Sequence, residues 1–413
     1  MWVCRNILPG NRKLITLAVL FLAALSPLAN DLRAVPSADG LYVTFTIKRA
    51  AVNLGDFTCS LNYQLAPRTT ANFVRLATGS GGWLDFRTGS ASRKPFYDGI
   101  TFHRVVAGFV IQGGSPNGLG TDGPGYTIKD EFHPSLRHSK AGILSMANSG
   151  LNSNSSQFFV TLGATPWLDD VHSVFGEVVE NLSIAQSVQA GDVIERATII
   201  RVGTAAQAFD PDAQSLPTVV DTIPTLLRNA STYRLDYPQS DDAEYFVFHS
   251  PDLANWQQLS GSEFYIAPPS QTGRDVTAVA TDVSKKFFIV SKVQYPDALQ
   301  TPPTMNGKRI VVTDPRQFTF TWDLANAASG SYSTSLSTGT FPIIAYNWTQ
   351  EAYRGRLTGS VSGLVLSSGE PITQVDLSFT FTDASSGTCK GNLIGQFGNQ
   401  FGMAGPFTVG NLP

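Results

Sequence analysis

The sequence contains few cysteines, few histidines and few charged residues, and each shortage excludes a class of function. Of 413 residues, three are cysteine and five are histidine, and 15% are charged. No CxxC pair and no cluster of His, Cys and carboxylate residues has metal-ligand spacing, so we expect neither a metal nor another cofactor. Cys59 and Cys389 fall in different predicted modules and Cys4 in a predicted leader, which argues against a structural disulfide.

The charges that are present are balanced and dispersed. Lys and Arg number 29 and Asp and Glu 32, which gives a formal net charge of -3, and no block of like charge occurs. Binding to nucleic acid or to an anionic membrane through charge requires a basic patch, so we expect neither partner. Low charge together with 37 glycines, 24 prolines and 11% aromatic residues is typical of domains rich in sheet and turns, many of them extracellular.

The first thirty residues differ from the rest. Three basic residues precede an apolar run of 16 residues, Leu14 to Ala29. This order predicts a secretory signal peptide over residues 1–29, and hence a protein exported to the periplasm, the envelope or the medium. The alternative is an uncleaved membrane anchor, but the run contains Pro27 and falls short of the roughly 20 residues that cross a bilayer. We expect no membrane association beyond this segment.

The remainder divides into three predicted modules. Residues 41–203 form the first, and residues 217–296 form a smaller β-rich module. Residues 309–413 alternate between apolar and polar side chains, which predicts an antiparallel sheet or barrel. The stretches between the modules are rich in Ala, Asp and Pro and predict linkers.

The first module begins with two predicted antiparallel strands, Leu41–Ile47 and Gly55–Tyr63. Pro67 then opens a segment with apolar residues at helical spacing that stops at Gly79, which predicts a helix between them. Further strands are predicted from Phe96 to Gly203, separated by long loops of Gly, Asn and Ser.

One arginine stands in an otherwise apolar run. In the string "FHRVVAGFVIQGG", which begins at Phe102, Arg104 lies in a predicted strand, where an unpaired buried charge is costly. Taken alone, the string fits a half-buried strand whose arginine side chain reaches out to water. The alternative is that Arg104 points into a site that uses its charge.

The neighbouring strings favour such a site. In this order the chain contains "NFVRLATG", "PFYDGITFHRVVAGFVIQGG", "GPGYTIKDEF", "KAGILSMANSGLNSNSSQFFVTL" and "PWLDDVHSVFGEVVE". Together these strings resemble the cyclophilin family of peptidyl-prolyl cis/trans isomerases, over about residues 41–202. The resemblance implies a mainly β fold, with a closed eight-stranded antiparallel barrel, two capping helices and an active site on the outer face. The two smaller β-rich modules follow this barrel.

The resemblance also implies the site residues. Arg104 matches the family's catalytic arginine, Gln112 lies beside it, and Asn148 belongs to the segment that holds the substrate backbone. The residues that it implies for substrate binding are Phe109, Val110, Gly120, Ala147, Gln157, Phe159, Trp167, Leu168 and His172. Proline-containing polypeptides are the implied substrates, and Trp167 implies sensitivity to cyclosporin-type inhibitors.

The expected chemistry needs no covalent nucleophile. Rotation about a peptide bond faces a barrier of roughly 18–20 kcal/mol, because the nitrogen lone pair is delocalised into the carbonyl. A guanidinium aimed at that nitrogen donates a hydrogen bond that strengthens as the resonance is lost, so it binds the twisted state better than the planar one. The sequence thus predicts arginine-assisted isomerisation of X-Pro bonds in exported proteins, without a covalent intermediate or a metal.

One position departs from the family pattern. Val110 stands where the family commonly has methionine, and valine offers a shorter and stiffer apolar wall. We expect an altered substrate preference with activity retained. His172 is assigned to the pocket wall, because the isomerisation transfers no proton.

Other functions are weighed against this one. A proline-peptide binding module or cell-surface scaffold with little turnover would use the same pocket, and the Val110 exchange leaves room for it. The glycine-rich stretch Gly113–Gly125 lacks the GK[ST] ending of a phosphate loop, so nucleotide binding is not expected. Core positions are expected for the large aromatic residues of the accessory modules, namely Trp256, Trp322, Trp348 and Tyr353. The sequence sets neither the client proteins nor the oligomeric state.

Overall fold

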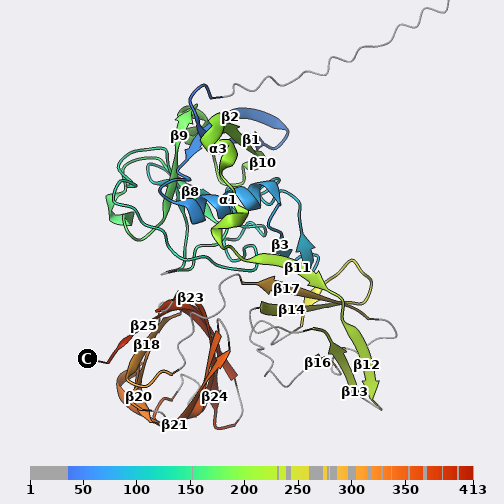
Figure 1. Ribbon diagram of the computed structural model, residues 1–413, viewed down its shortest axis with the longest axis vertical. Coiled ribbons are helices and arrows are strands. Elements are labelled where there is room, and N and C mark those ends of the chain that lie inside the picture. The colour runs from blue at the N-terminus through green and yellow to red at the C-terminus, as the bar shows by residue number, and fades with distance from the viewer. Residues whose placement is uncertain are drawn as a thin grey trace, which may run out of the picture. The chain divides into compact units, whose positions relative to one another are not determined.

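The structure is a computed structural model of the chain. It describes residues 36–150, 152–229, 232–238, 243–259, 273–276, 279, 286–295, 304–314, 318–326, 329–335, 337–351, 354–365, 370–383, 385–397 and 400–412. The predicted signal peptide, residues 1–29, and Tyr353 lie outside the described residues. Among the described helices, none combines the length and the apolar character needed to cross a bilayer. Figure 1 shows the elements along the chain.

A long hairpin opens the first module, as the alternating sequence predicted. Strand β1 (Gly40–Arg49) pairs antiparallel with β2 (Val52–Leu61). Phe45 lies opposite Phe57 on the buried face, with ring centroids 5.0 Å apart. A cross-strand aromatic pair of this kind stabilises a sheet by roughly 0.2–1 kcal/mol relative to a pair of alanines.

The hairpin belongs to an eight-stranded antiparallel sheet, in the order β10-β1-β2-β9-β7-β8-β6-β5. Each of its strands overlaps a stretch that the sequence predicted as strand, and β1 and β2 begin before their predicted bounds. The others are β5 (Arg104–Val106), β6 (Val110–Gly113), β7 (Ile143–Met146), β8 (Phe158–Thr161), β9 (Val174–Glu180) and β10 (Val193–Val202).

The prediction that this sheet closes into a barrel is wrong. The sheet curls, but its edge strands β5 and β10 form no ladder with each other. The chain ahead of β5 meets β10 through the isolated bridge from Thr101 to Val193 and through backbone hydrogen bonds between residues 99–102 and residues 191–194. The three residues of β5 begin after these contacts, so no continuous ladder joins the two edges.

The predicted helix is α1 (Pro67–Thr78). It ends where Gly79 takes a left-handed conformation with φ 76°, which glycine adopts without strain. The Phe73 ring lies in the core of the module, 4.7 Å from Tyr97 and 5.3 Å from Phe175 between ring centroids. A second, shorter helix, α2 (Leu182–Ser187), follows β9, so the two expected helices are present.

Two stretches of this module have structure that the sequence did not predict. The loop after α1 contains a hairpin of β3 (Trp83–Asp85) and β4 (Ser90–Ser92). The predicted linker after β10 begins with α3 (Gly203–Ala208) and contains a 3-10 turn, η2 (Asp212–Gln214). Ala206 is buried in the core of the first module, so this segment packs onto the domain that it leaves.

The second module contains two small antiparallel sheets, in the orders β11-β17-β14-β15 and β12-β13-β16. Trp256 packs against a buried apolar cluster, and its Nε1 donates to the Leu253 carbonyl at 3.1 Å, so it occupies the expected core position. The strands are β11 (Thr218–Thr222), β12 (Thr225–Asn229), β13 (Thr232–Asp236), β14 (Ala243–Ser250), β15 (Gln257–Gln258), β16 (Gly273–Asp275) and β17 (Phe287–Gln294).

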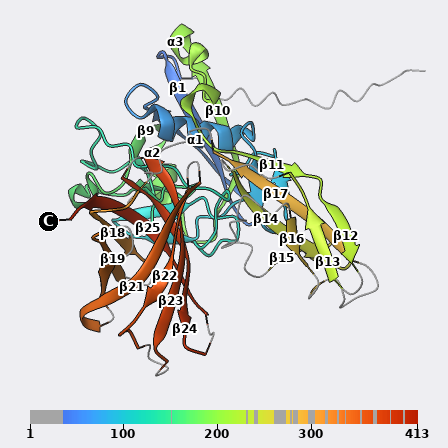
Figure 2. The same cartoon turned by 60° about the horizontal axis from the view of Figure 1, so that its bottom comes forward.

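The third module is a closed antiparallel barrel, which β25 completes by pairing with β18 (Figure 2). Trp322 is fully buried in its core, and Trp348 is partly buried against the same cluster, as expected. The strands are β18 (Lys308–Thr313), β19 (Thr319–Leu324), β20 (Gly330–Thr334), β21 (Ser337–Glu351), β22 (Arg354–Val361), β23 (Ile372–Asp383), β24 (Ser386–Gly395) and β25 (Gln400–Asn411).

Candidate active site

Arg104 begins β5, and its side chain is exposed at the sheet surface. Strand pairing places it directly opposite Gln112 on β6, and its Nη1 donates to Gln112 Oε1 at 3.5 Å. Its Cζ lies 5.8 Å from the ring centroid of Phe109, in cation–π contact. Because residues opposite each other in an antiparallel pair share one face, the register itself directs the arginine and the glutamine to the same surface.

A relay of amide side chains continues from Arg104. Gln112 Nε2 donates to Gln157 Oε1 at 3.2 Å, and Gln157 Nε2 donates to the Gly120 carbonyl at 3.0 Å. Gly120 has φ 76°, and a Cβ there would lie 3.1 Å from His103 Nε2, so this turn requires glycine. Two glutamines and a fixed backbone carbonyl therefore orient the guanidinium.

Aromatic side chains surround this relay. The Phe109 ring is stacked with the Trp167 ring, with centroids 6.1 Å apart, and Trp167 is 65% exposed. Phe159, opposite Gln112 on β8, is buried and meets the His172 ring edge to face at 5.4 Å. Trp167 and the half-buried Leu168 come from a 3-10 turn, η1 (Pro166–Leu168). The predicted wall residues thus gather on the surface where Arg104 lies.

Val110 occupies a different kind of position. It lies on β6 opposite Thr161 and is only 2% exposed. Since side chains two residues apart on a strand point to the same face, Val110 shares the face of Gln112 but is covered by its neighbours. The short side chain is therefore buried beneath the surface on which Gln112 lies.

Ala147 and Asn148 follow β7 and are held by two hydrogen bonds. The Ala147 N–H donates to the Gln157 carbonyl at 2.9 Å, and Asn148 Nδ2 donates to the Val171 carbonyl at 2.8 Å. These bonds connect the segment expected to hold the substrate backbone to the relay on one side and to the loop before His172 on the other.

A buried histidine that the sequence analysis missed supports the wall segment 165–172. His138 Nδ1 lies 2.9 Å from Asp169 Oδ1, and its Nε2 lies 3.0 Å from Ser145 Oγ. Its ring stacks on Phe159 at 5.8 Å. Both His138 and Ser145 are fully buried, so this serine–histidine–aspartate arrangement holds the wall and does not meet a substrate.

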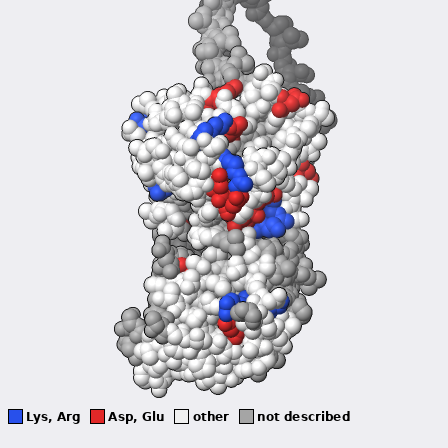
Figure 3. All heavy atoms as spheres, turned by 90° about the vertical axis from the view of Figure 1, so that its left-hand side faces the viewer, with Lys and Arg blue, Asp and Glu red and all other residues white. Residues whose placement is uncertain are grey.

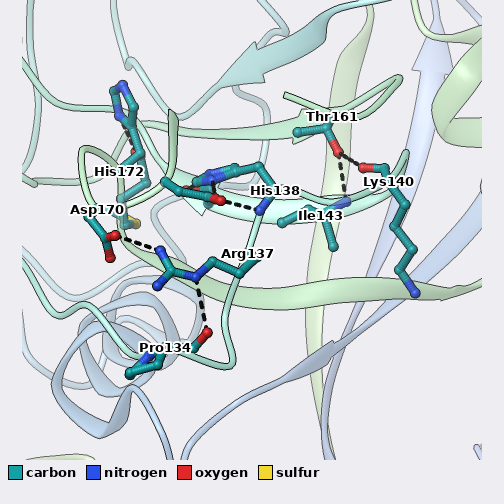
Figure 4. Close-up of polar contacts among 11 residues, drawn as sticks. Pro134, Arg137, His138, Lys140, Ile143, Thr161, Asp170 and His172 are labelled. Carbon is teal, nitrogen blue, oxygen red and sulfur yellow. Dashed lines mark hydrogen bonds and ion pairs between the residues drawn. The ribbon is translucent and has the colours of Figure 1, made fainter. Parts of the chain in front are cut away.

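The backbone and a surface ion pair strengthen the same connection. The Thr165 N–H donates to the His138 carbonyl, and the His138 N–H donates to Asp169 Oδ1, both at 2.8 Å. Arg137 forms an ion pair with Asp170 at 2.6 Å, as Figure 4 shows. No local sequence pattern indicates these contacts, because the partners are far apart in the chain. His138 and Asp169, for example, are separated by 31 positions.

Burial governs the protonation of the histidines near the site. It lowers the pKa of His138, and the hydrogen bond to Asp169 offsets this only in part. Burial likewise lowers the pKa of His172, whose Nδ1 contacts the Met146 carbonyl at 3.0 Å. Burial would raise the pKa of Asp169, but the hydrogen bonds from His138 outweigh it and lower that pKa. At neutral pH, His138 and His172 are therefore neutral and Asp169 is ionised.

The lowered pKa values of His138 and His172 predict that the first module loses stability in mild acid. Below pH about 6.5, the ordinary pKa of histidine, the unfolded chain binds protons that folded His138 and His172 do not yet bind. The free energy of unfolding should therefore fall as the pH decreases from about 6.5 towards their folded pKa values. Urea denaturation at a series of pH values, followed by circular dichroism, measures this. His138→Gln should make the free energy of unfolding less dependent on pH in this range. An unchanged slope would mean that groups other than His138 cause the dependence.

Within the described residues, no group of three or more His, Cys, Asp or Glu side chains could hold a metal ion. Cys59 and Cys389 are buried thiols, and burial raises the pKa of both.

On the face that Figure 3 presents, Lys and Arg side chains lie among Asp and Glu side chains, so positive charge does not gather on this face.

A known family matches the first module. The family model described as "Cyclophilin type peptidyl-prolyl cis-trans isomerase/CLD" matches residues 42–204. The peptidyl-prolyl cis-trans isomerase B of Streptomyces anulatus is 48% identical over 141 residues, which are 34% of this chain and 78% of that protein. The peptidyl-prolyl cis-trans isomerase A of Mycobacterium tuberculosis is 49% identical over 128 residues, 31% of this chain and 70% of that protein. A crystal structure of a cyclophilin type isomerase from Cryptosporidium parvum is 26% identical, with a TM-score of 0.32, and the match covers 39% of this chain and 98% of that one.

Proposed function

Because this chain belongs to the cyclophilin family of peptidyl-prolyl cis-trans isomerases, we propose that it isomerises X-Pro bonds of exported polypeptides at the surface around Arg104. The observation that carries the proposal is the position of Arg104. An exposed guanidinium is oriented by Gln112 and lies beside the aromatic rings of Phe109 and Trp167. This places a fixed hydrogen-bond donor next to apolar surface that can hold a proline ring.

The reaction needs a donor that acts on a twisted amide. Uncatalysed X-Pro exchange takes tens to hundreds of seconds, because resonance must be lost on the way. In the twisted state the nitrogen becomes pyramidal and basic, and a hydrogen bond from Arg104 to it is stronger than one to the planar amide. This difference lowers the barrier without a covalent intermediate or a metal.

The other residues hold the substrate and limit water. The rings of Phe109, Phe159 and Trp167 exclude solvent around the proline, and a lower local dielectric strengthens the arginine's hydrogen bond. The strand end at Ala147 and Asn148 holds the peptide backbone. Gln112 restricts the guanidinium to orientations that face the amide, so less freedom is lost when the twisted state forms.

Export is the second part of the proposal. It is supported by the basic residues and the apolar run of residues 1–29. An exported isomerase would meet polypeptides that fold after leaving the cytoplasm, a process that slow X-Pro exchange delays.

One fractionation experiment tests both parts. The whole chain is expressed in a bacterial host, and each cell fraction is assayed with an Ala-Pro peptide, with and without cyclosporin. We expect accelerated isomerisation in the exported fraction and inhibition by the drug, which would contact Trp167. Activity confined to the cytoplasm would refute export, and peptide binding without acceleration would identify a scaffold in place of an enzyme.

A further inference from the structure

A cleft of about 550 Å³ continues from the candidate active site. It shares the lining residues Gln112, Gly120, Ala147, Asn148 and Gln157 with that site. From there it follows the glycine-rich loop as far as Gly125. Its remaining lining includes Phe86 of the β3–β4 hairpin, Thr388 of the barrel, and three residues of the second module, Glu244, Phe246 and Tyr295. A polypeptide bound beside Arg104 can therefore extend into a cleft whose wall comes partly from the accessory module.

The β3–β4 hairpin anchors this wall. The Ala91 N–H donates to Asp221 Oδ1 at 2.7 Å, and Ser291 Oγ lies 2.7 Å from the same oxygen and 3.2 Å from the Gly89 carbonyl. One apolar cluster also spans the hairpin, the loop and the accessory sheet, and its buried members include Leu84, Tyr126, Val219, Phe248 and Val293. A shared core therefore holds the accessory residues in place at the cleft.

The wall is aromatic with a polar rim. The Phe86 ring lies edge to face against Phe246 and Phe248, with centroids 6.0 Å from each. Tyr295 is half-buried against the same cluster, and its hydroxyl donates to Glu244 Oε2 at 3.3 Å. Edge-to-face and offset contacts with such rings favour another aromatic side chain over an aliphatic one of similar size.

We propose that the wall formed by Phe86, Phe246 and Tyr295 binds an aromatic side chain of the polypeptide a few residues away from the proline, and we call this wall the subsite. The proposal rests on the proposed function, since the side chain enters as part of the chain held at Arg104. Continuity identifies the occupant, because five lining residues belong to the active site and a separate ligand there would obstruct the substrate. The accessory module thus selects substrates by the sequence around the proline.

Steady-state kinetics of the whole chain test the subsite. The reference substrate is a blocked peptide with Ala-Pro among alanines, and the others carry one phenylalanine at successive positions on either side of the proline. At one or more positions, phenylalanine should raise kcat/KM roughly tenfold over alanine, mainly through KM. Tyr295→Ala and, separately, Phe86→Ala should remove most of that gain. Tyr295→Phe keeps the ring and should retain the gain.

The matched control is Ile223→Ala, because Ile223 belongs to the same module, is 91% exposed and does not line the cleft. This variant should keep the increase in kcat/KM that phenylalanine gives over alanine. If the alanine peptide is isomerised but no phenylalanine position raises kcat/KM, the subsite is refuted and the proposed function stands. A gain that survives in both Tyr295→Ala and Phe86→Ala also refutes it. If lysine at the same position raises kcat/KM as much as phenylalanine does, the subsite does not select an aromatic side chain and the proposal is refuted. Failure to isomerise the alanine peptide would overturn the proposed function itself.

Discussion

Arg104→Ala is expected to lower kcat/KM for an Ala-Pro peptide by roughly 10²- to 10³-fold, the usual effect of removing one donor that acts in the transition state. The loss should fall mainly on kcat, because the planar substrate gains little from the arginine. Folding should be unaffected, since the side chain is exposed and makes one long hydrogen bond, 3.5 Å, to Gln112. Peptide exchange measured by a coupled protease assay or by NMR exchange spectroscopy gives both constants.

Arg104→Lys is the sharper variant. Lysine keeps the charge but loses the planar fork that lets one guanidinium donate to the substrate while it faces Gln112 and stacks on Phe109. We therefore expect most of the loss to remain. Recovery to nearly full activity in Arg104→Lys would show that charge alone suffices, against the geometry proposed for the relay.

Arg196→Ala is the matched control for both variants. Arg196 is an exposed arginine on β10, on the opposite edge of the same sheet from β5. Its removal should leave kcat/KM unchanged within error. An Arg104→Ala protein as active as Arg196→Ala would overturn the arginine mechanism.

The strands and the helix of the first module could be anticipated because their signals are local, whereas the set of site residues came from the resemblance to the cyclophilin family. Arg104 and Gln112 lie on either side of one tight connection between β5 and β6, so the pairing of two short strands is enough to bring them together. The helix from Pro67 to Gly79 carries its own start and stop residues. For the β5–β6 pair and for α1, residues close together in the sequence are enough to determine the local structure.

Closure of the sheet could not be anticipated, because it depends on how far a single strand extends. β5 has three residues, and it is the segment ahead of it, residues 99–102, that meets residues 191–194 through backbone hydrogen bonds and the bridge at Thr101. The position of the accessory wall depends on contacts between residues still farther apart in the sequence, such as Ala91 and Asp221, 130 positions apart. No pattern in the hairpin or in the accessory strand shows that the two will be neighbours, because that depends on how their side chains pack in the folded protein.

The second large effect is expected in the third module, where Trp322→Ala should lower the free energy of unfolding of the barrel by roughly 3–5 kcal/mol. Trp322 is fully buried, and its ring stacks on Tyr332 of the neighbouring strand with centroids 5.0 Å apart. Removing the indole leaves a cavity in a core closed on all sides by β18–β25, which has no free edge through which it can collapse. Chemical denaturation followed by circular dichroism measures the loss.

Trp322→Phe separates the packing of the ring from its polar group. Among the described residues, the Trp322 Nε1–H is buried without a hydrogen-bond partner, so phenylalanine keeps part of the stacking and removes a donor that is costly to bury. We expect it to cost clearly less than Trp322→Ala. If both variants lower the free energy of unfolding equally, the indole N–H must itself form a stabilising hydrogen bond, for example to water.

Isomerase activity in Trp322→Ala tests whether the modules are independent. The core around Trp322 and the core of the first module share no residues, and Trp322 does not line the cleft beside the active site. Loss of the barrel should therefore leave kcat/KM for the alanine peptide unchanged. Because Thr388 of the barrel lines the cleft, the phenylalanine peptides are not used for this comparison. A Trp322→Ala protein that loses isomerase activity along with barrel stability would show that the two cores unfold as one cooperative unit, against the three-module organisation expected from the sequence.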